Sequence, residues 1–393
     1  MRGSLNSAWR TEWKPWLTRT TAAADELADK GIRRLRKRLG REGVPKIQPY
    51  VGYASSGSVQ LHGRVLTNPP TGSDLRHHRW WDNLADTIRR FASDEVPGVE
   101  IEATYHDQRL SVLTDAEGYF RAVLPRPAKS GDAFWDVAKL RMTNHPKARR
   151  QSDQAVAQVM NVPDEARFGI ISDVDDTILH TGATDIATMA KLTFFGNART
   201  RAPLDGVAKL YEHLQSGKDR RPINPIFYVS SSPWNLHDLL EDFLGLNGIP
   251  FGPLLLRDFG IDEAKFIMSG HDHKLEKARR LIKAFDRLPF LLFGDSGQED
   301  ARLYASVARE FPDRIAGIFI RDIDPNGDND HDEKVDRYVC QAAEVGVPMY
   351  LVADSTQVAT IAIDHGWLSA TALDSIVEAS KRDKSRSKGI LQP

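Results

Sequence analysis

The chain has 393 residues, 41% of them hydrophobic and 27% charged, and a net charge of −1. This composition is typical of a soluble protein that buries two or three cores. The single cysteine, Cys340, excludes internal disulfides and cysteine-based zinc sites and favours a cytoplasmic protein. No apolar run reaches the ~20 residues that span a bilayer, and no apolar core follows the amino-terminal charges, so we expect neither a membrane helix nor a secretory signal.

Residues 1–47 are predicted to be a basic helical segment, because residues 1–49 carry seven more basic than acidic side chains. Its helix over 22–39 has a thin apolar stripe beside a run of arginines. This pattern is compatible with peripheral binding to an anionic membrane surface, and a solvated charged helix is the alternative. Nucleic acid binding is not expected, because no aromatic side chains interleave with the basic run.

Residues 48–150 are predicted to form a small β-sandwich. The segment VEIEATY alternates strictly, and a turn at Asp115–Gly118 precedes an aromatic strand. Short strands are expected at 57–66, 99–105, 109–113, 119–124 and 135–141, with a helix at 78–92. The partner of this domain is unknown. Residues 151–164 have lost the alternation and are predicted to be a linker.

Residues 165–372 are predicted to form a doubly wound α/β domain. Five continuous apolar runs (FGIIS, PIFYV, PFLLFG, AGIFI and PMYLVA) are separated by amphipathic stretches of helical length. Such runs indicate parallel strands that are covered on both faces. Helices are expected at 205–215, 234–243, 274–286, 298–310, 333–345 and 356–366, and residues 373–393 are predicted to be a basic tail. Ligands of such folds bind at the carboxyl ends of the strands.

The first of these runs ends in a D-x-D-x-T pattern formed by Asp173, Asp175 and Thr177. Each carboxylate at the end of a buried strand costs several kcal/mol to desolvate unless a cation or hydrogen bonds offset it. Bound Mg²⁺ resolves this cost, because Mg²⁺ prefers carboxylates together with substrate phosphate oxygens. The alternative interpretation is an Asp-rich turn after a strand.

Residues further along the chain complete one phosphoryl-transfer mechanism. Asp173 would attack phosphorus to form an aspartyl-phosphate, and Asp175 would act as general acid and then as general base. Ser230 would contact a phosphoryl oxygen, and a lysine near position 274 would balance the negative charges. Asp295 would bind the metal, with Asp300 as a second ligand or a holder of metal-bound water.

Each of these interpretations has a structural alternative. Ser230 starts a Ser-Ser-Ser-Pro turn that could cap a helix, and the segment GDSGQED could be a loop before a helix. Lys274 and Lys277 lie on a charged helix where lysines are usually solvated, and Lys274 is favoured because it is nearest the helix start. The further candidates for substrate binding are Thr177, Ser231, Lys277 and Gly294.

The segments SDVDDT, YVSSSPWNL, HKLEK and FGDSGQED resemble the four motifs of the haloacid dehalogenase (HAD) superfamily. The sequences of these segments are similar to those of the phosphatidate phosphatase catalytic domain of the actin-patch-protein family, and the resemblance covers roughly residues 165–367. The resemblance implies an HAD-like fold and Mg²⁺-dependent hydrolysis of phosphatidate to diacylglycerol and phosphate. It also implies the same roles for the site residues: Asp173, Asp175, Ser230, Lys274 and Asp295. The segment TDAEGYF is similar to the transthyretin-like regulatory domain of carboxypeptidases.

Two alternatives to this function remain: a phosphatase for a soluble phosphomonoester, and a scaffold protein that binds phosphate and Mg²⁺ without turnover. Only a small cap fits between Thr177 and the helix at 205, and its Phe194 and Phe195 either face a bulky substrate or belong to a core. Residues 322–333 fit a calcium-loop pattern, but a strand precedes them and Asn329 stands where that loop wants an apolar residue. An acidic solvated loop is therefore favoured there.

Overall fold

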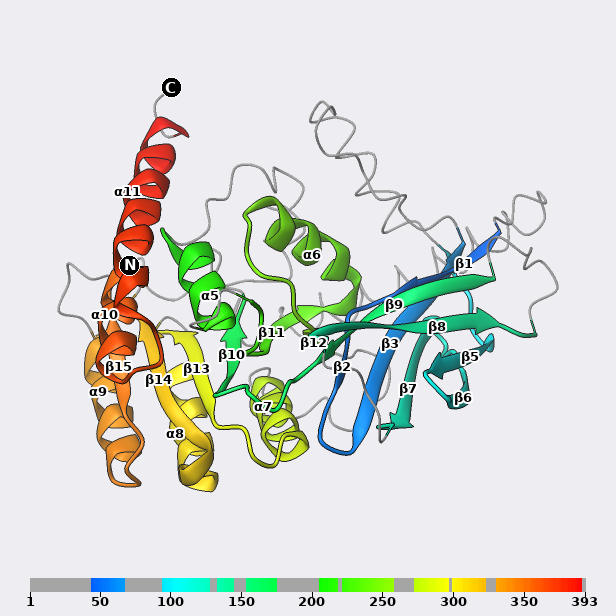
Figure 1. Cartoon of the computed structure of the whole chain (residues 1–393), viewed down its shortest axis with the longest axis horizontal. Helices are drawn as coiled ribbons and strands as arrows, with labels where there is room; N and C mark the ends of the chain where they lie inside the picture. Colours follow the sequence, from blue (N-terminus) through cyan, green and yellow to red (C-terminus); the bar gives the residue numbers. More distant parts are fainter. Residues whose placement is uncertain are drawn as a thin grey trace, which may run out of the picture.

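The computed structural model describes residues 44–67, 94–127, 133–144, 153–174, 205–217, 221–257, 272–296, 299–322 and 330–390. They form an amino-terminal unit built on an antiparallel-rich sheet and a carboxyl-terminal α/β unit built on a parallel sheet (Figure 1). The predicted helices at 22–39 and 78–92 and the cap after Thr177 lie outside the described residues. In the described part of the chain, no helix combines the length and apolarity that crossing a membrane requires.

The amino-terminal unit has nine strands, and every strand expected from the sequence is present. They are β1 (Pro45–Pro49), β2 (Gly52–Ala54), β3 (Ser58–Thr67), β4 (Asp94–Glu95), β5 (Glu100–Tyr105), β6 (Gln108–Leu113), β7 (Tyr119–Pro125), β8 (Trp135–Met142) and β9 (Gln154–Asn161). The inward side chains of β5 and β7 alternate with outward ones and pack into one core, as the sequence pattern predicts. Hydrogen bonds join all nine strands into one sheet, so the two separate sheets of a simple sandwich are not seen among the described residues.

The prediction of a linker at 151–164 is wrong for residues 154–161, which form β9. This strand pairs with β8 on one side and with β2 on the other. Its inward residues Ala157 and Val159 are buried, but Val156, which precedes Ala157, is exposed. The apolar side chain on the exposed face concealed the alternation in the sequence.

The α/β unit contains six parallel strands in the order β12-β11-β10-β13-β14-β15. Five of them are the predicted apolar runs, and the sequence analysis missed the short β12. Their bounds are β10 (Gly169–Asp173), β11 (Ile226–Pro233), β12 (Leu254–Arg257), β13 (Phe290–Asp295), β14 (Ile315–Arg321) and β15 (Met349–Val352). All residues of β10 and β13 are buried, because helices cover both faces of the sheet.

The predicted helices of this unit are confirmed, with ends shifted by a few residues. They are α5 (Val207–Ser216), α6 (His237–Leu246) after a 3-10 turn (Trp234–Leu236), α7 (Asp272–Ala284), α8 (Asp300–Glu310), α9 (Asp330–Ala343) and α10 (Ser355–Asp364). Helices α5, α6 and α10 pack on one face of the sheet, whereas α7, α8 and α9 pack on the other. Residues 323–329 of the candidate calcium loop lie outside the described residues.

The predicted basic tail is instead a helix, α11 (Leu373–Ile390), as far as residue 390. Its Ile376 is fully buried in the core that α5 and α10 share. The backbone N–H of Gly206, before α5, donates to Asp383 Oδ2 at 3.0 Å. The basic side chains concealed this apolar contact in the sequence.

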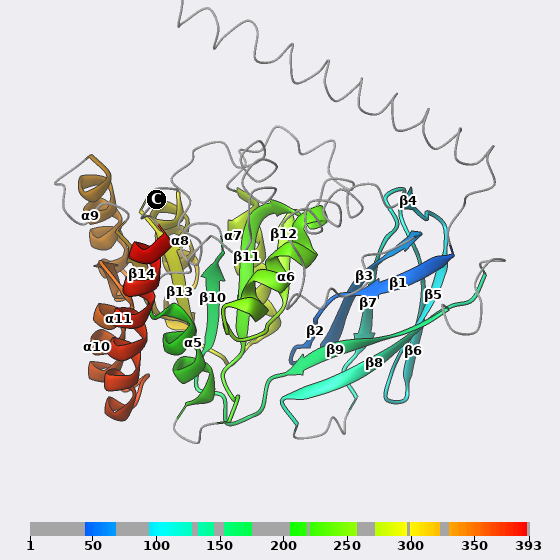
Figure 2. The ribbon, with the colours of Figure 1, turned by 90° about the horizontal axis from the view of Figure 1, so that it is seen from above.

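The two units pack against each other along α7 and the β11–β12 side of the parallel sheet (Figure 2). Tyr53 of β2 enters the core of the α/β unit, where its ring lies against Phe227 and Phe285. Tyr50 stacks on Trp234 and on His237 just beyond β11. The amino-terminal sheet therefore supports the side of the α/β unit on which β11 ends.

Candidate active site

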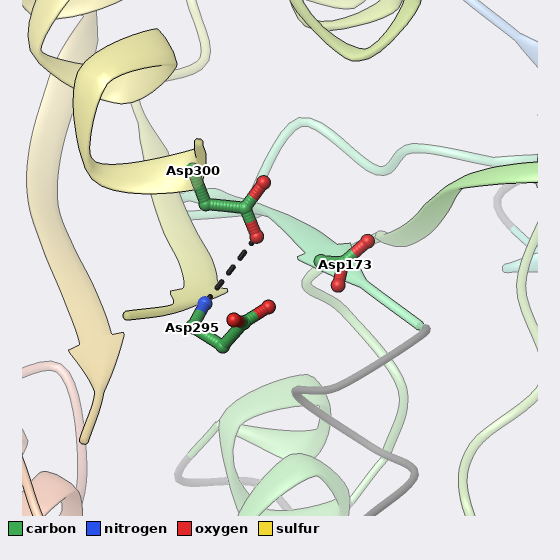
Figure 3. Close-up of side chains that lie close together, drawn as sticks. All are labelled: Asp173, Asp295 and Asp300. Carbon is green, nitrogen blue, oxygen red and sulfur yellow. Dashed lines mark hydrogen bonds between the residues drawn. The ribbon is translucent and has the colours of Figure 1, made fainter. Parts of the chain in front are cut away.

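Three carboxylates meet at the carboxyl edge of the parallel sheet (Figure 3). Asp173 ends β10, Asp295 ends the adjacent strand β13, and Asp300 is the first residue of α8. Their side chains are fully buried, and one oxygen from each lies within 4.8 Å of the others. The structure thus brings together three residues that the sequence analysis assigned to one metal site.

Lys274 supplies a cation to this cluster from α7. Its Nζ lies 2.8 Å from Asp173 Oδ1 and 3.0 Å from Asp300 Oδ1, and the residue is only 2% exposed. The four side chains together carry two more negative than positive charges when all are ionised. A further cation would offset that excess in a site from which water is largely excluded.

Gly294 lets α8 approach β13 closely. A Cβ at this position would lie 2.6 Å from Asp300 Cβ and 2.9 Å from the Tyr304 ring. The backbone N–H of Asp295 donates a hydrogen bond to Asp300 Oδ2 at 3.3 Å, and this bond holds the Asp300 carboxylate at the end of β13. The glycine predicted to bind substrate is thus placed where it positions Asp300.

The predicted serines lie on β11, the neighbour of β10 on the other side. Val229 pairs in register with Asp173, so Ser230 lies one residue beyond the strand-end carboxylate. Ser230 is fully buried, and its Oγ accepts a hydrogen bond of 2.8 Å from the backbone N–H of Ser232. Ser231 is half-buried. The last residues of β11 therefore place hydroxyl groups at the same edge of the sheet as the carboxylates.

Within the described residues, Lys277 forms hydrogen bonds with β12. It is one helical turn further along α7, and its Nζ donates to the backbone carbonyl of Leu255 at 3.1 Å and to that of Leu256. It therefore satisfies carbonyls of the edge strand β12, and Lys274 is the lysine that reaches the carboxylates. Asp175 and Thr177, the other two members of the first motif, lie outside the described residues.

Two buried tyrosines that the sequence analysis did not identify lie next to the carboxylates. The Tyr211 hydroxyl is 2.8 Å from the Ser172 hydroxyl, and the Tyr304 hydroxyl donates to the Phe293 carbonyl at 3.1 Å. Burial raises the pKa of both phenols, and the charge of Asp173 raises each further. Both tyrosines have helical core spacing, so only their proximity to Asp173 distinguishes them from ordinary core residues.

The donor set fits Mg²⁺. The cluster consists of carboxylate oxygens, with no histidine or cysteine in it, and hard cations prefer oxygen ligands. Carboxylates from three separate elements converge while fully buried, and such an arrangement is costly unless cations compensate the negative charges.

The same region of the chain matches known proteins. Residues 168–322 match the family described as "Phosphatidate phosphatase APP1, catalytic domain". Phosphatidate phosphatase APP1 of Saccharomyces cerevisiae is 36% identical over 156 residues, which are 39% of this chain and 26% of that protein. An uncharacterized protein of Schizosaccharomyces pombe is 28% identical over 60% of this chain and 39% of its own length. The resemblance predicted from the motifs is therefore confirmed over residues 168–322.

These curated relatives are longer proteins, and the chain spans between a quarter and two-fifths of their length. Among solved structures, a carbohydrate acetylesterase from Xanthomonas citri covers 77% of this chain and 75% of its own, at 13% identity. Its TM-score of 0.28 is too low to bear on the fold.

Proposed function

We propose that the chain is a Mg²⁺-dependent phosphatidate phosphatase that releases diacylglycerol and phosphate. The observation that carries the proposal is the buried cluster of Asp173, Asp295 and Asp300, in which Lys274 forms ion pairs with Asp173 and Asp300. This cluster lies within the residues that match the phosphatidate phosphatase catalytic domain.

In the first half-reaction, the Asp173 carboxylate attacks the phosphorus of the monoester. A bond forms between the aspartate oxygen and phosphorus, and the bond between phosphorus and the alkoxide of diacylglycerol breaks. Asp175, two residues further on, gives its proton to that alkoxide. In the second half-reaction Asp175 takes a proton from water, and the water oxygen displaces phosphate from Asp173.

Lys274 holds Asp173 in place through the 2.8 Å ion pair and offsets repulsion between the carboxylate and the anionic substrate. Asp173, Asp295 and Asp300 would hold Mg²⁺, which would supply further positive charge for the transferring phosphoryl group. Ser230, Ser231 and Thr177 would contact phosphoryl oxygens. Asp175 is also a potential metal ligand in this proposal.

The proposal extends to the fold and to the place of action. A parallel sheet with an acidic end at β10, a serine near the end of β11 and a second acidic motif that starts at the end of β13 supports an HAD-like domain. The basic segment 22–39 supports peripheral contact of a cytoplasmic enzyme with an anionic membrane surface.

The test is phosphate release from phosphatidate in mixed micelles, with Mg²⁺ or EDTA, by the full chain and by Asp173→Asn. We expect release that requires both Mg²⁺ and Asp173, with the variant retaining the unfolding temperature of the wild type or exceeding it. Release of phosphate from a soluble phosphomonoester but not from phosphatidate would support the proposed mechanism and reject phosphatidate as the substrate. Release by Asp173→Asn at the wild-type rate would reject the aspartyl-phosphate, and no release from any substrate would favour a binding protein.

A further inference from the structure

A cavity of about 300 Å³ lies at the carboxyl edge of the parallel sheet, beside the carboxylate cluster. The ends of β13, β14 and β15 form one side of it, and the first turns of α5 and α10 form the other. Two of its lining residues adjoin the site: Gly294 precedes Asp295, and the hydroxyl of Tyr211 bonds to Ser172, which precedes Asp173. The cavity and the cluster therefore share a wall.

The interior of the cavity is apolar. Its side chains are each at most 5% exposed and come from helices and strands on both sides: Val207, Leu210, Phe293, Phe319, Val352 and Val358. A polar ligand group placed among them would lose its hydrogen bonds to water without replacement, whereas a hydrocarbon group would be stabilised by leaving water. An engineered apolar cavity of about 150 Å³ is large enough to bind benzene, so this one has room for an alkyl chain of several carbons.

The rim of the cavity is charged. Lys384 Nζ of α11 lies 3.4 Å from Asp354 Oδ2, and Asp205 and Arg321 complete the rim. Arg321 ends β14 and pairs in register with Asp295, so this cavity residue is the neighbour of one of the three carboxylates. An apolar floor with a charged rim next to a phosphoryl site matches a molecule with an anionic head and a hydrocarbon body.

We propose, building on the proposed function, that this cavity binds hydrocarbon of the substrate's leaving group while its phosphoryl group is at Asp173. The α/β unit then selects alkyl phosphomonoesters through its own core, at Val207, Val352 and Val358. Each buried methylene is worth at most about fourfold in affinity, so selectivity should rise steeply with chain length until the cavity is full.

The experiment uses alkylphosphonates, whose phosphorus–carbon bond is not hydrolysed, and measures their binding to the full chain with Mg²⁺ by titration calorimetry. We expect octylphosphonate to bind at least tenfold more tightly than butylphosphonate. Val358→Phe fills the cavity and should reduce this preference to below threefold. Ile361→Phe adds an aromatic ring on the same helix away from the cavity and should leave the preference unchanged.

Equal affinities of the wild type for the two phosphonates, or an unchanged preference in Val358→Phe, would overturn the inference. If Val358→Phe fails to fold, as judged by circular dichroism, Val358→Thr keeps the shape, adds a hydroxyl and should also weaken the preference. Phosphate release from dihexanoyl phosphatidate separates the two proposals. Hydrolysis of this lipid without a preference for octylphosphonate would support the proposed activity and reject hydrocarbon binding in the cavity. A preference for octylphosphonate without hydrolysis would support hydrocarbon binding in the cavity and reject the proposed phosphatidate phosphatase activity.

Discussion

Replacing Lys274 by methionine tests how much the stability and activity of the carboxylate cluster depend on this lysine. The substitution keeps an unbranched side chain but removes a charge that lies 2.8 Å from Asp173 and 3.0 Å from Asp300, in a position only 2% exposed. Removing one partner of a buried ion pair costs about 3–5 kcal/mol, because the remaining charge is left buried without compensation. Here three buried carboxylates would remain, so we expect a loss in the upper part of that range.

The free energy of unfolding is measured by urea titration with tryptophan fluorescence, in EDTA and in Mg²⁺. Because Mg²⁺ would bind the folded cluster, the free energy of unfolding of each protein should rise with Mg²⁺, by about 2.7 kcal/mol at a concentration one hundred times its own dissociation constant. The deficit of Lys274→Met relative to the wild type should therefore change only as far as loss of the lysine alters the affinity for Mg²⁺. Phosphate release should fall by about a hundredfold to a thousandfold, the order of effect that loss of one preorganised charge-stabilising group produces.

Lys277→Met is the matched control. It removes the same charge from the same helix, but its amine bonds to carbonyls of β12. It should lose stability independently of Mg²⁺ and keep its activity per folded molecule. A Lys274→Met protein that is as stable as the wild type in EDTA, or a wild type whose free energy of unfolding does not change when Mg²⁺ is added, would refute the assignment of these carboxylates to a cation site.

Two further predictions concern packing and pH. Gly294→Ala places a Cβ 2.6 Å from Asp300 Cβ, so we expect a loss of about 1–3 kcal/mol and weaker Mg²⁺-dependent phosphate release; an unchanged unfolding temperature would contradict this close approach. Burial, with nearby positive charges, lowers the pKa of His62 to about 3. The unfolded chain takes up this proton below about pH 6.5, so stability should fall as pH drops from 6.5 toward 3, by up to about 1.4 kcal/mol per pH unit. The His62 ring lines a cavity, and water in that cavity reduces the pH dependence of stability. In His62→Phe, the free energy of unfolding measured with urea should vary less with pH than in the wild type. An equal pH dependence in the two proteins would exclude His62 as its origin.

The secondary structure that the sequence predicted is the part encoded by local pattern. Continuous apolar runs identified β10, β11, β13, β14 and β15, because strands covered on both faces have no polar side to show. Strand β12 has only four residues, and its burial depends on α6 and the amino-terminal sheet rather than on its own pattern. The linker prediction failed at β9 for the same reason: pairing with β2, about a hundred residues earlier in the chain, buries residues whose own alternation is incomplete.

The candidate site also has a part that could be predicted from the sequence and a part that could not. The carboxylates at 173, 295 and 300 were predictable, because strand order brings the ends of β10 and β13 together and because acidic residues at buried strand ends need a cation. The two lysines were not separable by sequence, since both lie on one helix three residues apart. Packing separates them: Lys274 faces the carboxyl edge of β10 and the start of α8, whereas Lys277 faces the carbonyls of β12. Which lysine reaches the carboxylates thus depends on how α7 packs against the sheet, and this packing is a property of the whole core. The residues of α7 that are buried in that core are Ala278, Leu281 and Ile282.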